Sequence, residues 1–223
     1  MGTRNLTMVI NKQGEIKVAQ YGQWDGYPSG QGLTTLKFCS DKKNIKALEQ
    51  VIEKTRFFNK CNDIDRWLEG YEARVKDEYD RTKTEESKVK RTDSDIYWFE
   101  NTQTRDLGAS ILYSIITLDM DRLPIEHNKK IYLRDESEFG KSSLFCEWAY
   151  CINLKTKTLQ CFEGFNTNKE LEYELFKTDQ KEIDEYFEDR TKYYGVRLVA
   201  EYKLNKLPNE KKFLKDLGEE VED

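Results

Sequence analysis

The stretch YGQWDGYPSGQG, residues 21–32, holds the side chains of this chain that are best suited to binding chemistry. It contains four of the chain's 12 glycines, together with three aromatic residues, two glutamines and one carboxylate. Glycine adopts backbone angles closed to other residues, and the amides of such a loop can face an anion. The spacing matches neither a P-loop nor a Rossmann fingerprint, so a phosphate cradle is only weakly supported.

Two interpretations of this glycine-rich stretch stay open. Gln23, Asp25 and Gln31 carry directional hydrogen-bonding groups, while Trp24 and Tyr27 offer flat apolar surface. This mixture is typical of the lining of a pocket for a small molecule or a peptide. The alternative is a structural turn in which Trp24 and Tyr27 fill the core and a proline rigidifies the exit.

Charged residues outside the loop extend the candidate site. Glu147 lies in LFCEWAYC, where its apolar neighbours predict burial, and a buried carboxylate must be paired, hydrogen-bonded or protonated. A salt bridge to Arg4 or Arg105 is the favoured interpretation, and a general acid or base is the alternative. The predicted ligand-binding set is Arg4, Gln23, Trp24, Asp25, Tyr27, Gln31, Arg105 and Glu147.

Metal and nucleophile chemistry have few candidates, so we expect neither a metal site nor a cofactor. His127 is the single histidine and is expected in a surface loop. Cys146 and Cys151 are expected on one strand, where a separation of five residues places them on opposite faces. The opening hairpin resembles that of N-terminal-nucleophile hydrolases and would make Thr3 the nucleophile, but methionine removal exposes Gly2 instead.

Length and charge bound the class of protein. The 223 residues can bury a sizeable core, and aromatic residues at 13% compensate for a hydrophobic fraction of 37%. A net charge of -5 argues against binding of nucleic acid or of an anionic membrane over a broad surface. It does not exclude a local basic groove. The odd number of cysteines without C-x-x-C spacing, and the lack of a signal peptide, favour a cytoplasmic protein.

Hydrophobic periodicity predicts an α+β fold with a mixed or antiparallel sheet built from hairpins. The expected strands are 4–10, 15–21, 143–154, 158–165 and 194–204. The expected helices are 33–58 with a break near Ser40, 63–79, 104–118 and 179–190, followed by an acidic helix or tail. We interpret residues 1–223 as a single domain that carries a charged helical insertion at about 41–93.

Four blocks, MGTRNLT, YGQWDGYPSGQG, RDLGASIL and SLFCEWAYCINL, occur in this order between residues 1 and about 165. Together they resemble a recurring family of poorly characterised proteins of bacteria and their phages. The resemblance implies that the chain works by binding host proteins, including those of defence systems. It names no activity.

Three functions follow as hypotheses. The first is a binding protein, such as a phage counter-defence inhibitor, that occupies a host protein or a small polar ligand. The second is a hydrolase or nucleotide-acting enzyme with a site built from Arg4, Asp25 and Glu147. The third is a binder of RNA or single-stranded nucleic acid that uses aromatic stacking and the lysines of 42–60 and 76–91.

Overall fold

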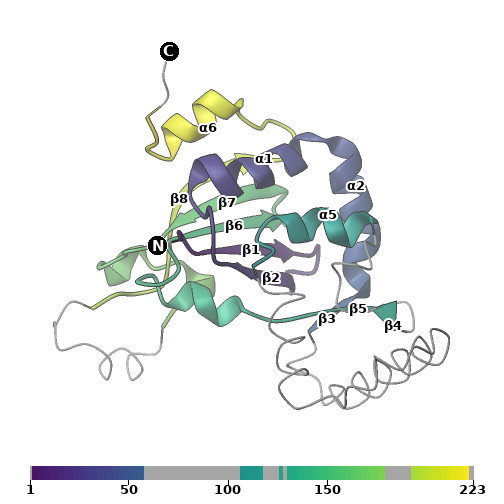
Figure 1. Ribbon diagram of the computed structural model, residues 1–223, viewed down its shortest axis with the longest axis horizontal. Helices are drawn as coiled ribbons and strands as arrows, with labels where there is room; N and C mark the ends of the chain where they lie inside the picture. Colours follow the sequence, from purple (N-terminus) through teal and green to yellow (C-terminus); the bar gives the residue numbers. More distant parts are fainter. Residues whose placement is uncertain (1, 58–105, 118–125, 128–129, 179–191, 221–223) are drawn as a thin grey trace, which may run out of the picture.

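The computed structural model describes residues 2–57, 106–117, 126–127, 130–178 and 192–220. A five-stranded sheet forms its centre (Figure 1). The strand order is β2-β1-β6-β7-β8. The strands are β1 (Asn5–Ile10), β2 (Ile16–Gly22), β6 (Trp148–Asn153), β7 (Thr158–Glu163) and β8 (Arg197–Lys203).

Both hairpins predicted from the alternating patterns are present in this sheet. β1 pairs antiparallel with β2, and β6 pairs antiparallel with β7, which also pairs antiparallel with β8. The two hairpins join through β1 and β6, which run parallel with Asn5 opposite Trp148. The sheet is therefore mixed, and the α+β class with hairpin-built strands is confirmed.

A second, smaller sheet has the order β3-β5-β4. Its strands are β3 (Thr55–Phe57), β4 (Glu126–His127) and β5 (Lys130–Leu133). His127 thus belongs to a strand, and the expectation of a loop there is wrong. β3 also ends the helical pattern expected to reach residue 58, because Thr55–Phe57 pairs with β5.

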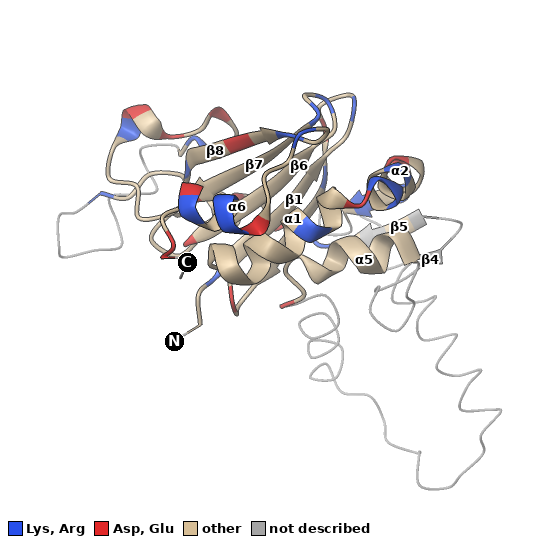
Figure 2. Cartoon of the chain, turned by 90° about the horizontal axis from the view of Figure 1, so that it is seen from above, with Lys and Arg blue, Asp and Glu red and all other residues tan. Residues whose placement is uncertain are grey.

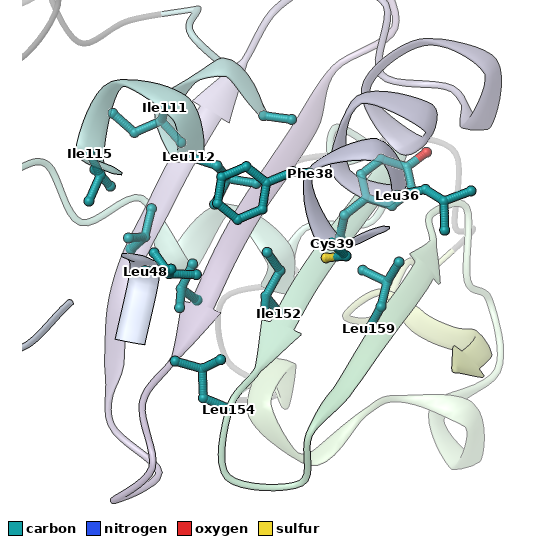
Figure 3. Packing of buried hydrophobic residues seen from close by; sticks show 14 of the residues in the cluster. Leu36, Phe38, Cys39, Leu48, Ile111, Leu112, Ile115, Ile152, Leu154 and Leu159 are labelled. Carbon is teal, nitrogen blue, oxygen red and sulfur yellow. The ribbon is translucent and has the colours of Figure 1, made fainter. Parts of the chain in front are cut away.

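Four helices cover one face of the large sheet (Figure 1). They are α1 (Leu33–Ser40), α2 (Lys42–Val51), α5 (Ser110–Thr117) and α6 (Glu210–Asp216). Phe38, Leu48 and Leu112 from three of these helices pack with Ile152 and Leu159 of the sheet (Figure 3). The part of the expected insertion that the structure describes is thus integral to the core, while 58–93 lies outside the described residues.

The opposite face of the sheet carries a second buried cluster. Leu6, Met8 and Ala149 point to this side, and Phe176 packs against them. Short 3-10 segments, η5 (Ser137–Lys141) and η7 (Glu174–Phe176), cover the cluster in place of long helices (Figure 1). Because the sheet is buried on both faces, its central strands are apolar on both sides.

Several predicted helices and strands were longer than the observed ones. The helix expected at 104–118 begins only at Ser110, because Asp106 and Gly108 adopt positive φ angles of 68 and 48 degrees. The strand expected from residue 143 begins at Trp148, after a turn. Cys146 therefore precedes β6, and it packs in the same cluster as Cys151, so the prediction of opposite faces is wrong. The helices expected at 63–79 and 179–190 lie outside the described residues.

Candidate functional site

The glycine-rich stretch forms a tightly held turn between β2 and α1. Residues Pro28–Gly32 make a single π-helical turn, η1, that runs directly into α1. The Gly26 amide donates to the Thr3 carbonyl at 2.9 Å, and the Gln31 amide donates to the Asp25 carbonyl at 2.8 Å. π-Helical turns are rare and occur often at functional sites.

The glycines of this turn are required by close approach of the backbone. A Cβ at Gly30 would lie 2.1 Å from the carbonyl oxygen of Asp25, and one at Gly26 would lie 2.6 Å from that of Thr3. Asp25 itself takes the left-handed conformation, with a φ of 55 degrees. The amides of Gly26, Gly30 and Gly32 donate to the Thr3 and Tyr27 carbonyls, so they are already bonded within the protein and leave no support for an anion cradle made of these three glycines.

The two glutamines of the predicted site act inside the protein. The Gln31 side chain accepts from the Ala109 amide at 2.8 Å and donates to the Trp24 carbonyl at 3.4 Å, so it ties the turn to the start of α5. Gln23 accepts a hydrogen bond from the hydroxyl of Tyr21. These contacts assign both amides a structural role.

The aromatic side chains of the turn lie at the surface. Trp24 is 58% exposed and Tyr27 is 41% exposed, so the interpretation in which they fill the core is wrong. The Tyr27 hydroxyl donates to Oδ1 of the exposed Asp25 at 3.0 Å, and this hydrogen bond raises the pKa of Tyr27. One edge of the indole of Trp24 packs against the backbone of Gly2, where an added Cβ would be 2.3 Å from Cε3.

The pairing of Arg4 with Glu147, expected as one of two options, is present. The Arg4 amide donates to Oε1 of Glu147 at 3.1 Å, and the Arg4 Nε lies 3.6 Å from the same oxygen. Both side chains are partly exposed, at 29% and 22%, so Glu147 is less buried than its neighbours predict. The Arg4 guanidinium also lies 5.1 Å from the ring centroid of Phe145, which is exposed.

Residues 2–4 bring most of the predicted site together. Gly2 contacts Trp24, Thr3 bonds to Gly26, and Arg4 bonds to Glu147. We call the surface formed by Arg4, Trp24, Tyr27 and Phe145 the aromatic loop face. Arg105 lies outside the described residues, so its place relative to this face stays a prediction.

A buried tyrosine fixes the aromatic loop face to the sheet. Tyr150 of β6 is fully buried, and its hydroxyl donates to the Gly26 carbonyl at 2.9 Å. Burial raises the pKa of this hydroxyl well above its ordinary value, which keeps it a hydrogen-bond donor. Trp148, two residues earlier, stacks parallel to Tyr150 with centroids 6.3 Å apart.

A pocket lies at the other end of the sheet and was missed by the sequence reasoning. Its volume is about 460 Å³, and it is lined by the end of α1, by α2, by the β6–β7 turn and by the end of β8. Lys42, Lys157 and Lys203 contribute to its lining, and Cys39, Ile45 and Leu204 supply apolar surface. We call it the lysine pocket. The lining comes from three stretches that are far apart in the sequence, 39–49, 156–157 and 203–205, so no local sequence pattern could predict the pocket.

The thiols near these regions are poorly suited to nucleophilic chemistry. Cys39, Cys146, Cys151 and Cys161 are all buried and free. Burial raises the pKa of Cys151 to about 12 and raises the pKa of the other three thiols further. Cysteine attacks as the thiolate, so these four side chains are inert at neutral pH.

The described residues hold neither a metal-binding cluster nor a membrane-spanning helix. Within these ranges, no group of three or more His, Cys, Asp or Glu side chains is arranged to hold a metal ion. No described helix is both long enough and apolar enough to cross a bilayer.

Comparison of the chain with protein-family models, with curated proteins and with solved structures found no match. The resemblance of the four sequence blocks to phage and bacterial proteins therefore stays a prediction.

Proposed function

We propose that this chain is a binding protein that docks on a partner protein through the aromatic loop face. The observation that carries the proposal is the exposure of Trp24 and Tyr27 on a backbone that internal hydrogen bonds and steric contacts hold in place. Phe145 adds a third exposed ring beside Arg4. Protein interfaces are enriched in aromatic residues and arginine at their centres.

The held backbone supports this function energetically. Ordering a loop and its side chains on binding costs free energy, and a loop that is already ordered avoids most of that cost. Trp and Tyr are among the residues whose truncation to alanine costs the most binding free energy, because each buries a large area in the complex. A single tryptophan in this position can therefore dominate the affinity.

A protein partner fits this face better than a small polar ligand. The side chains of Gln23 and Gln31 are hydrogen-bonded to Tyr21 and Ala109 of the protein itself. The exposed groups that remain are mainly apolar rings. The identity of the partner as a host protein, and a counter-defence role, are supported by the resemblance of the four blocks alone.

The enzyme alternative has weaker support from the same geometry. Glu147 already accepts from the Arg4 amide and lies beside its guanidinium, while the Asp25 carboxylate accepts from Tyr27 at the surface. These contacts give both carboxylates structural partners and form no enclosed acid–base pair.

The test compares Trp24→Ala with Leu171→Ala, since Leu171 is also largely exposed but lies in a different segment, η6 (Lys169–Leu171). Proteins that the wild type captures from a bacterial lysate are purified and titrated by calorimetry with the wild type, with Trp24→Ala and with Leu171→Ala. We expect Trp24→Ala to weaken binding by about 2 kcal/mol or more, and Leu171→Ala to leave it unchanged.

Equal affinity of the wild type and Trp24→Ala for every captured protein would overturn the proposal. Nuclease treatment of the lysate tests the remaining alternative, which is binding of nucleic acid. If capture by the aromatic loop face disappears with nuclease and falls steeply with salt, the face binds nucleic acid instead of protein.

A further inference from the structure

The lysine pocket combines a cavity with an unusual local charge. Lys42 begins α2, Lys157 lies in the β6–β7 turn and Lys203 ends β8, so three separate elements each bring one lysine to the lining. Figure 2 shows basic residues gathered at this turn and at the end of β8. The chain as a whole has a net charge of -5, so this concentration of positive charge runs against its average.

The three lysines have no carboxylate partner among the described residues. Within the described part of the chain, neither Lys42 nor Lys157 nor Lys203 takes part in an ion pair. Glu49, the carboxylate at the pocket, is paired instead with Lys12, with Nζ and Oε2 3.2 Å apart. Unpaired like charges around one concavity repel each other, and an anion between them would relieve that repulsion.

The remaining lining is mixed, with Thr156, Asn205 and Glu49 as polar members and an apolar part made of Cys39, Ile45 and Leu204. Ile45 and Leu204 pack against the helix-covered core and contribute to the pocket, and Cys39 is almost fully buried beside them. A volume of about 460 Å³ lies within the roughly 300–1,000 Å³ that is usual for small-molecule sites. An inorganic ion alone would leave the apolar part of this space unfilled.

We propose that the lysine pocket binds a small organic anion, with its phosphate or carboxylate group among the lysines and its apolar body against Ile45 and Leu204. Lysine is suited to this role because its ammonium acts as a flexible point charge for anions. The site is separate from the aromatic loop face, so the inference does not rest on the proposed protein partner.

Four probes separate the contributions of charge and apolar body. The probes are 1-naphthyl phosphate, 1-naphthoate, 1-naphthol and inorganic phosphate, each titrated into the full chain by calorimetry. We expect the two aromatic anions to bind at least about tenfold more tightly than either 1-naphthol or inorganic phosphate. The ratio between the phosphate ester and the carboxylate then identifies the preferred anionic group.

Variants locate the binding. Replacing two exposed surface charges in the double variant Lys157→Gln/Lys203→Gln is expected to weaken 1-naphthyl phosphate about tenfold. Lys54→Gln removes one exposed lysine from η2 (Ile52–Lys54), outside the pocket, and is expected to leave the affinity unchanged. Trp24→Ala is also expected to leave it unchanged, which distinguishes this site from the aromatic loop face.

Because all the substituted lysines are exposed, the variants are expected to fold, and circular dichroism checks this. The inference is overturned if neither aromatic anion binds, if 1-naphthol binds as tightly as they do, or if the double lysine variant retains wild-type affinity.

Discussion

The aromatic loop face and the lysine pocket lie at opposite ends of the same sheet and are built in opposite ways. The face lies beside the start of β1 and β6, where Asn5 is opposite both Gly22 and Trp148. The pocket lies where β6 turns into β7, at the pair Asn153 and Thr158. One region is an exposed apolar surface on a fixed backbone, and the other is a concavity with exposed charged side chains at its edge.

The difference lies in where the polar groups of each region are used. In the loop, backbone amides, carbonyls and two glutamine side chains are bonded within the loop or to neighbouring segments of the protein, so that mainly the rings are left for a partner. In the pocket, the lysine ammonium groups have no ion-pair partner among the described residues. A region that satisfies its own polar groups offers area and shape, while a region that leaves charges unpaired offers selectivity for the opposite charge.

The largest expected effect concerns the inner wall of the lysine pocket. Cys61 lies outside the described residues, so the measurement uses Cys61→Ser. Burial and the raised pKa of the remaining thiols predict alkylation by iodoacetamide at pH 8 at least about 100-fold slower than for a free cysteine. Mass spectrometry should find no label on the folded protein and four labels in urea. Rapid labelling of Cys39 in the folded protein would show that the pocket opens into the core.

The next effect concerns the backbone of the loop. Gly30→Ala places a Cβ against the Asp25 carbonyl, which an ordinary side chain cannot move aside, and should destabilise the protein by about 2–3 kcal/mol. Ser29→Ala, at an exposed neighbouring position, should stay within about 0.5 kcal/mol. Urea denaturation monitored by tryptophan fluorescence measures both. Equal stability of the two variants would mean that the loop is less tightly held than its contacts indicate.

A smaller effect tests the link between the loop and the sheet. Tyr150→Phe removes the hydroxyl that bonds to the Gly26 carbonyl inside the core, and the unsatisfied carbonyl should cost about 1–2 kcal/mol. Tyr113→Phe is the matched control, because the partly exposed Tyr113 hydroxyl has no hydrogen bond within the described ranges. The same denaturation experiment applies. If Tyr150→Phe lowers the free energy of unfolding no more than Tyr113→Phe does, the Tyr150 hydroxyl does not hold the loop to the sheet.

Much of the fold could be predicted from local patterns. Leu6, Met8 and Ile10 alternate along β1 and share one buried cluster, as the period of a strand requires. The helix boundaries were less predictable, since Asp106 adopts a positive φ although nothing in RDLG demands it. That conformation depends on contacts of the segment, such as the Ala109 amide with Gln31, that only the folded chain makes.

The candidate site was predicted in part. Arg4 and Glu147 are 143 residues apart, and their pairing was one of two options for a carboxylate expected to be buried. The exposure of Trp24 and Tyr27 could not be read from their types, because a glycine-rich turn can direct large rings inward or outward. The lysine pocket left no local signal, since its walls come from three separate stretches of the sequence, 39–49, 156–157 and 203–205.

The sequence by itself determined the two hairpins, the glycine-rich turn after the first hairpin and the helix-forming stretch that follows that turn. Each depends on interactions between residues near in the chain, where side-chain period and glycine spacing are sufficient. The tertiary structure decided the parallel pairing of β1 with β6, the outward direction of the aromatic rings and the gathering of three lysines around one cavity. These features depend on contacts between distant segments, whose geometry is fixed only when the two cores pack around the sheet.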